Sequence, residues 1–222
     1  PAHANDLLDT VLALRRTAAP VALPAPPDDP VYAPAYRYMA GLIALVNRDI
    51  PSVFAHYEAA SRASPVYRKA WLDASEALRR MGDLGAAAKS IRRYEEIAGH
   101  PTVESRTEEV HLLRLSDRLD EAERIARDLT QANPDPHLLM LHAGVLAQME
   151  RHREAEAIYR RILAMHPQDS LAAYNLAFTC EQQGNLGEAI RYYRTAVAVR
   201  DDFAAADENL GHILMQQGAL PG

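Results

Sequence analysis

A repeat of about 34 residues runs through most of this chain and limits the possible folds more than any other feature. A small residue recurs once in each repeat: Val53, Ala87, Ala122, Ala155 and Ala189. Consecutive members differ in sequence number by 34, 35, 33 and 34. Larger residues mostly stand four positions after each member, and a further set stands seven positions after. Offsets of four and seven share one face of an α-helix, so each repeat is predicted to contain an amphipathic helix.

Proline and glycine divide the repeats. Proline ends four successive repeats, and glycine recurs at whole multiples of the repeat length: Pro65, Pro101, Pro134, Pro167; Gly82, Gly184, Gly218. Proline stops a helix, and glycine suits a tight turn between two helices. Each repeat is therefore predicted to be a helix pair, and the chain all-α. The predicted units are 34–67, 68–102, 103–135, 136–169 and 170–203, followed by a final helix at 204–217.

These positions resemble the tetratricopeptide repeat family over about residues 34–217. The family pattern has W-x2-L-G-x2-Y in the first helix of a unit and A-x3-F followed by P in the second. Trp71 fills the tryptophan position of the second unit. In the fifth unit, Leu176, Ala177 and Cys180 match the first helix, and Ala189, Tyr193 and Ala196 match the second. The resemblance implies a right-handed superhelix of helix-turn-helix repeats. It implies an architecture and no particular activity.

The third unit departs from this pattern. Arg106 and Glu109 stand where tryptophan and leucine are expected. We therefore expect the first helix of that unit to be shifted in register or locally loose.

The region before the repeats has a different character. Residues 1–19 contain an amphipathic pattern with Leu7, Leu8, Val11 and Leu12 on one face, which predicts a short helix. Residues 20–33 are rich in proline and predict an extended linker. An amphipathic helix this short is not stable alone, so we expect it to dock on the repeats or on a second copy of the chain.

Composition excludes several classes of function. A net charge of −6 without a basic tail argues against nucleic-acid binding. The single cysteine, Cys180, excludes an internal disulfide, and the nine histidines show no spacing typical of metal ligands. No apolar run reaches the roughly 20 residues of a membrane-spanning helix. We predict no catalytic residues, no metal, no cofactor and no membrane insertion.

In proteins of this family the first helix of each pair lines a concave surface. Asn175 and Asn209 are one repeat apart and share one inner position there. The resemblance implies that such asparagines bind the backbone of an extended peptide, because an amide both donates and accepts hydrogen bonds. Local bonding of these amides is the alternative. The same projection assigns Leu42, Leu45, Glu108 and Leu141 to the inner surface.

Exposed apolar side chains extend the candidate site. Tyr174, Phe178 and Met140 are expected beside the two asparagines, and Tyr38 and Met39 at the other end of the repeats. Exposed apolar clusters usually mark partner sites. For Tyr38 and Met39, the alternative is that the N-terminal helix covers them.

The sequence thus favours a non-catalytic scaffold that binds a protein or peptide partner in its concave groove. Two alternatives stay open. The chain could be the regulatory or substrate-recruiting arm of an enzyme, such as a glycosyltransferase, with its catalytic part beyond Gly222. It could also self-assemble through the N-terminal helix. The Ala- and Arg-rich composition suggests a bacterial gene, in either the cytoplasm or the periplasm.

Overall fold

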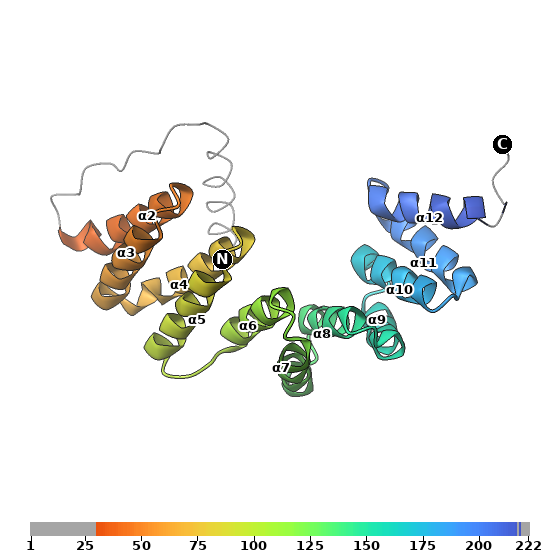
Figure 1. The fold of residues 1–222 in the computed structure, drawn as a ribbon, viewed down its shortest axis with the longest axis horizontal. Helices are drawn as coiled ribbons and strands as arrows, with labels where there is room; N and C mark the ends of the chain where they lie inside the picture. The colour runs from red at the N-terminus through yellow and green to blue at the C-terminus, as the bar shows by residue number, and fades with distance from the viewer. Residues whose placement is uncertain (1–29, 217, 219–222) are drawn as a thin grey trace. The chain divides into compact units, whose positions relative to one another are not determined.

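A computed structural model describes residues 30–216 and residue 218 (Figure 1). The described residues form eleven α-helices that pack as consecutive pairs, together with two short 3-10 helices. The all-α repeat fold that the period predicts is therefore confirmed. The predicted N-terminal helix at 1–19 and most of the predicted linker at 20–33 lie outside the described residues.

The chain divides into two compact units, residues 1–116 and 117–222. The N-terminal unit contains the 3-10 helices η1 and η2 and the α-helices α2 to α6: η1 Pro30–Tyr32, α2 Ala33–Val46, α3 Ile50–Ala63, η2 Pro65–Lys69, α4 Ala70–Arg80, α5 Leu84–Ala98 and α6 Val103–Leu115. Its core is built around Tyr57 and Trp71, which are 0% and 3% exposed and meet edge to face at 6.0 Å.

The C-terminal unit contains the α-helices α7 to α12: α7 Leu119–Ala132, α8 Pro136–Gln148, α9 His152–Met165, α10 Ser170–Gln182, α11 Leu186–Val199 and α12 Ala204–Gln216. The recurring small residues Ala155 and Ala189 are fully buried where these helices meet. Large side chains such as Ile162, Leu176 and Tyr193 fill the space between helices. The period of the sequence is thus a packing period, because each buried position meets its counterpart in the neighbouring pair.

Gly41 shows how closely the helices approach. A Cβ atom placed on Gly41 would lie 2.2 Å from the ring of Tyr57. No side chain fits at that distance, so α2 can pack on Tyr57 of α3 only with glycine at this position.

Aspartates fix where several helices begin. The carboxylates of Asp49 and Asp83 accept backbone N–H bonds at the starts of α3 and α5, and those of Asp135 and Asp169 do so at the starts of α8 and α10. These side chains satisfy donors that a helix leaves unpaired in its first turn.

The turns within the helix pairs share one backbone conformation. One residue in each turn, and one just after α12, is left-handed: Arg48, Gly82, Asp117, Glu150, Gly184 and Gly218. The sequence marks only the three glycines. At the other three positions the φ angle is 58°, 57° and 59°, which disfavours any residue with a Cβ. At Glu150 the turn is closed by the Arg151 N–H, which donates to the Leu146 carbonyl at 2.9 Å.

The third pair differs from the expectation. The buried positions of α6 are Ser105, Glu108, Val110, Leu112 and Leu113. Among them, Ser105, Glu108 and Leu112 follow Trp71, Ala74 and Leu78 at one common spacing of 34. Arg106 and Glu109 instead pair with each other at 2.7 Å and are only partly buried. Placing them at the tryptophan and leucine positions was therefore wrong by one residue.

The cause is the location of the extra residue in the longer spacing between Ala87 and Ala122. The spacing from Leu78 to Leu112 is still 34, so the insertion lies after Leu112. Helix α6 continues three residues beyond Leu112, whereas α4 continues two beyond Leu78. The first helix of this pair thus keeps the common register.

Candidate functional site

The candidate site begins with one position on the first helix of each pair. We call it the inner slot; its members are Met39, Asp73, Thr107, Leu141, Asn175 and Asn209. Three of these side chains make the same kind of contact with the first helix of the preceding pair. Asp73 accepts from the Tyr38 hydroxyl at 3.3 Å, Asn175 donates to the Met140 sulfur at 3.4 Å, and Asn209 donates to the Tyr174 hydroxyl at 3.3 Å. The inner slot therefore joins neighbouring first helices in both units.

Asn209 belongs to a hydrogen-bonded chain. Its amide nitrogen donates to the hydroxyls of Tyr174 and Tyr193, at 3.3 and 3.1 Å. The Tyr193 hydroxyl in turn donates to Glu181 at 2.8 Å. Burial and the neighbouring Glu181 carboxylate raise the pKa of Tyr193 well above its ordinary value. Both amide hydrogens of Asn209 are thus used internally, and its carbonyl oxygen is the group left to accept a bond from a ligand.

Asn175 is less constrained. It is partly exposed, and the hydrogen bond that its amide nitrogen makes among the described residues goes to the Met140 sulfur. Sulfur is a weak acceptor, so this bond is easily exchanged for one to a ligand. The backbone carbonyl of Asn175 accepts from Thr179 at 2.7 Å, which is a bond within the helix.

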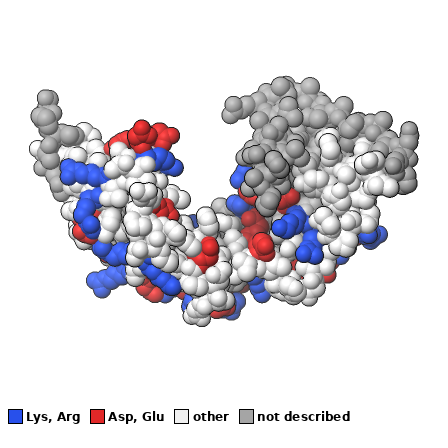
Figure 2. Space-filling model, turned by 180° about the vertical axis from the view of Figure 1, so that it is seen from behind, with Lys and Arg blue, Asp and Glu red and all other residues white. Residues whose placement is uncertain are grey.

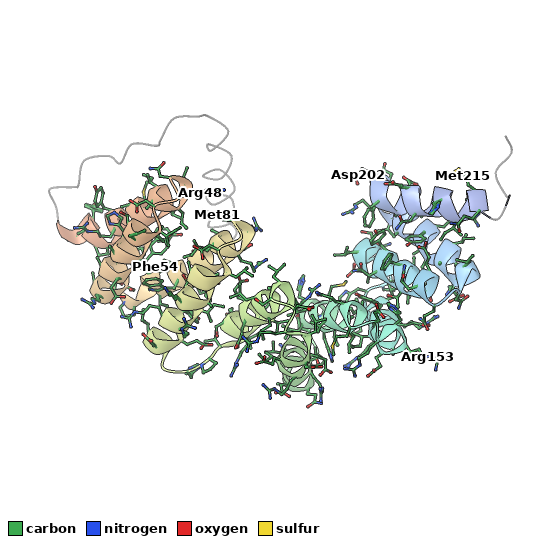
Figure 3. The ribbon with its side chains drawn as sticks, in the orientation of Figure 1. Arg48, Phe54, Met81, Arg153, Asp202 and Met215 are labelled. Carbon is green, nitrogen blue, oxygen red and sulfur yellow. The ribbon has the colours of Figure 1, made fainter. Side chains whose placement is uncertain are left out.

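Aromatic side chains surround the two asparagines. The ring of Tyr174 lies 4.9 Å from that of Phe203 and 5.7 Å from that of Tyr193, so Tyr174 is held in place and only partly exposed. Phe178, one turn along α10 from Tyr174, is 42% exposed. Figure 3 draws the side chains of the helices as sticks, with Asp202 labelled just before α12 and Met215 near its end.

An open hollow of about 1190 Å³ lies beside Met140. It is lined by the start of α8, the segment between α9 and α10, and the start of α10. Its apolar residues include Met165 and Leu171, which are 43% and 47% exposed. Sequence reasoning missed Met165, because only the first helix of each pair was expected to line the groove and Met165 ends α9, a second helix.

Tyr38 and Met39 belong to the N-terminal unit. The Tyr38 ring stacks on Tyr57 at 5.8 Å and lies 5.7 Å from Tyr67. Burial and the adjacent Asp73 carboxylate raise the pKa of Tyr38 above its ordinary value. Met39 is 50% exposed. Tyr38 is thus partly a packing residue, whereas binding of a partner at Met39 stays a prediction, because the N-terminal helix that could cover it lies outside the described residues.

Burial also raises the pKa of Asp73, from 3.8 to about 6. The Tyr38 hydrogen bond opposes this increase, and so does the positive charge of Lys69, whereas Glu76 adds to it. Asp73 pairs with no cation within ion-pair distance in the described part of the chain. Its position in the inner slot was not singled out from the sequence as a binding residue.

Four residues that the sequence assigned to the inner surface are buried: Leu42, Leu45, Glu108 and Leu141. Leu42 and Leu45 pack into the core of the N-terminal unit, and Leu141 is 7% exposed. Glu108 accepts from Ser75 at 3.3 Å and pairs with Arg79 at 2.8 Å. Its assignment was wrong because of the one-residue register error in the third pair.

Arginine and glutamate side chains pair along the outer helix faces. Arg151 lies 2.7 Å from Glu154, and Arg160 lies 3.0 Å from Glu188. Figure 2 shows basic and acidic side chains interspersed on the face that it presents. Exposed pairs of this kind contribute little to stability, so the main effect of these charges is to keep the helix surfaces hydrated.

The described residues offer little for catalysis. Cys180 is buried, and desolvation raises the pKa of its thiol to about 11, which disfavours the reactive thiolate. Within residues 30–216, no group of three potential metal ligands occurs. No helix among the described residues is both long enough and apolar enough to span a membrane.

Comparison with known proteins identifies the class. The tetratricopeptide repeat family model matches residues 38–101, 109–170, 141–197 and 181–222. The chain therefore belongs to the tetratricopeptide repeat family, whose members generally act in protein–protein interaction.

Solved structures share the fold. The chain is similar to PilW, described as a widely conserved type IV pilus biogenesis factor, with a TM-score of 0.67 and 23% identity over 86% of this chain and 88% of that one. It is similar to PilF of Pseudomonas aeruginosa, with a TM-score of 0.64 and 14% identity over 85% and 86% of the chains. YrrB, described as having an unusual peptide-binding site, gives a TM-score of 0.59 and 14% identity over 82% and 91%. No curated protein shows a significant match.

Proposed function

We propose that this chain is a non-catalytic binding module whose C-terminal unit holds an extended segment of a partner protein against α8, α10 and α12. The observation that carries the proposal is the inner slot of this unit. There, two asparagines lie among the partly exposed side chains of Met140, Tyr174 and Phe178.

The polar groups would set the register of the bound segment. The Asn209 carbonyl is held in place by the bonds from its amide to two tyrosine hydroxyls, so it can accept a backbone N–H at little entropic cost. Asn175 can exchange its weak bond to sulfur for a backbone carbonyl of the partner. One donor and one acceptor a repeat apart suit an extended backbone.

The apolar groups would supply most of the affinity. Phe178, Leu171 and Met165 are each between 42% and 47% exposed. Covering each of them would contribute about 1 kcal/mol, since full burial of such a side chain contributes roughly 1.5–3 kcal/mol. The hollow beside Met140 offers space for a partner side chain. The similarity of fold to YrrB, which is described as binding a peptide, agrees with this mode of action.

The test is a selection from a random dodecapeptide display library on the whole chain, followed by fluorescence anisotropy on the enriched peptides. We expect Asn175→Ala/Phe178→Ala to weaken binding at least tenfold, which corresponds to about 1.4 kcal/mol. The matched control is Gln131→Ala/Val199→Ala, which removes an exposed amide and a side chain that is also 42% exposed, both on second helices.

Circular dichroism must show equal helicity for both variants. Equal affinity of the wild type and the groove variant would place the binding site elsewhere and refute the proposal.

A further inference from the structure

The inner slot of the N-terminal unit differs from that of the C-terminal unit in its chemistry. The N-terminal unit holds Met39, Asp73 and Thr107 there, whereas the C-terminal unit holds Leu141, Asn175 and Asn209. An amide both donates and accepts, but an ionised carboxylate only accepts. Asp73 therefore adds a negative charge at a position where the C-terminal unit has neutral amides, although Tyr38 approaches Asp73 as Tyr174 approaches Asn209.

A second observation points to the same place. The hydroxyl of Tyr57 is fully buried and has no hydrogen-bond partner among the described residues. Tyr57 occupies the position that Tyr193 occupies four repeats later, and the Tyr193 hydroxyl contacts the inner-slot residue Asn209 at 3.1 Å. By this equivalence the Tyr57 hydroxyl faces towards Asp73, whose charge acts on it, but no hydrogen bond joins the two groups. A buried hydroxyl without a partner is uncommon in proteins and calls for an explanation.

The negative charge of Asp73 is not balanced by a paired cation among the described residues. Tyr38 donates to one carboxylate oxygen, Oδ2, at 3.3 Å. Tyr57, Glu76 and Lys69 are the other ionisable groups that act on this site, and Lys69 is not within ion-pair distance of Asp73. A half-buried carboxylate without a paired cation is costly to keep, which makes it a candidate for binding.

We propose that Tyr38, Tyr57, Tyr67 and Asp73 form a site for the ammonium group of a lysine side chain from a partner protein. The ammonium donates to the Tyr57 hydroxyl and to Oδ1 of Asp73, the oxygen to which no side chain among residues 30–216 donates. The neighbouring rings of Tyr38 and Tyr67, 5.7 Å apart, provide electron-rich faces next to the cation.

The geometry favours lysine over arginine. The planar fork of a guanidinium directs its paired protons at one carboxylate, whereas the diverging protons of a compact ammonium can reach an Asp73 oxygen and the Tyr57 hydroxyl together. An ammonium needs only one carboxylate oxygen and directs its other protons to further acceptors.

The site can be tested with n-butylammonium, which carries the lysine side chain's charge, against the neutral control n-butanol. Trp71 is the single tryptophan, lies 6.0 Å from the Tyr57 ring and reports on this unit. At pH 8, on the whole chain, we expect n-butylammonium to change Trp71 fluorescence saturably, with an affinity on the order of millimolar for so small a ligand. n-Propylguanidinium is expected to bind at least fivefold more weakly.

Asp73→Asn should abolish the saturable change, and the matched control Glu104→Gln, an exposed carboxylate of the same unit, should leave it intact. An equal response to n-butanol, or equal binding by Asp73→Asn, would overturn the assignment and leave a bridging water as the occupant of the site. This site and the proposed peptide groove lie in different units. Loss of n-butylammonium binding would therefore leave the groove proposal standing, and the converse also holds.

Discussion

Replacing Asp73 with asparagine is expected to stabilise the N-terminal unit at neutral pH. Asparagine has nearly the same shape and still accepts the bond from the Tyr38 hydroxyl, but it carries no charge. In the wild type, burial raises the pKa of Asp73 from 3.8 to about 6, so the folded unit favours the protonated carboxyl. Ionisation of Asp73 at pH 7 therefore lowers the free energy of unfolding of the wild type, and the uncharged asparagine avoids this loss.

The size of the effect follows from these pKa values. The difference between 3.8 and about 6 corresponds to a ceiling of about 3 kcal/mol, at 1.36 kcal/mol for each pH unit. Because the side chain is partly exposed, solvent screening reduces the gain, and we expect about 1–2 kcal/mol at pH 7. A raised carboxyl pKa gives a contribution that is fully present below pH 4 and is lost as the pH rises through 6. The advantage of the variant should therefore be absent at pH 4 and complete by pH 7.

The assay is urea denaturation followed by Trp71 fluorescence, at several pH values between 4 and 8. Trp71 is 3% exposed and lies on α4 with Asp73, so its signal follows the unfolding of this unit. Glu104→Gln serves as the control for removal of one negative charge. A gain that is the same at pH 4 and pH 7, or a loss of stability at pH 7, would refute the account of Asp73 as a desolvated carboxylate.

Three further substitutions test the packing. Glu150→Gly should raise stability by about 1 kcal/mol, because its φ of 59° suits glycine, and thermal unfolding measures the gain; an unchanged or lower midpoint contradicts it. Gly41→Ala should cost at least about 2 kcal/mol, since its Cβ would lie 2.2 Å from the Tyr57 ring; a Trp71-detected urea midpoint like the wild type's rules this out. Glu108→Ala should cost about 2–3 kcal/mol by leaving Arg79 unpaired, and an unchanged urea midpoint would show that the pair contributes nothing.

Sequence patterns predicted the fold class well and the surface of the groove less well. The alternation of buried and exposed positions reveals helices, but it cannot fix the register of a helix that lacks the expected apolar residues. In the third pair, Ser105 and Glu108 replace the expected large apolar residues, so the register error went unseen until burial was known. The hollow beside Met140 was also missed in part, since Met165 reaches it from a second helix.

The candidate residues themselves could be named from the sequence, but not their bonds. A shared slot for Asn175 and Asn209 follows from their separation by one repeat. That Asn209 commits both amide hydrogens to Tyr174 and Tyr193 does not follow, because Tyr193 lies on a different helix and its hydroxyl is directed by Glu181. Whether any of these residues contacts a partner remains a prediction for the experiments above.

The sequence by itself determined that the chain is an all-α array of helix pairs of the tetratricopeptide repeat family, because a packing period must recur in the positions that pack. The tertiary structure alone decided the chemistry of individual positions. Burial raises the pKa of Asp73. The buried Tyr57 hydroxyl has no partner among the described residues, and Glu108 is buried although the sequence predicted it on the inner surface. These properties depend on distances between residues that lie on different helices, and only the packed helices fix such distances.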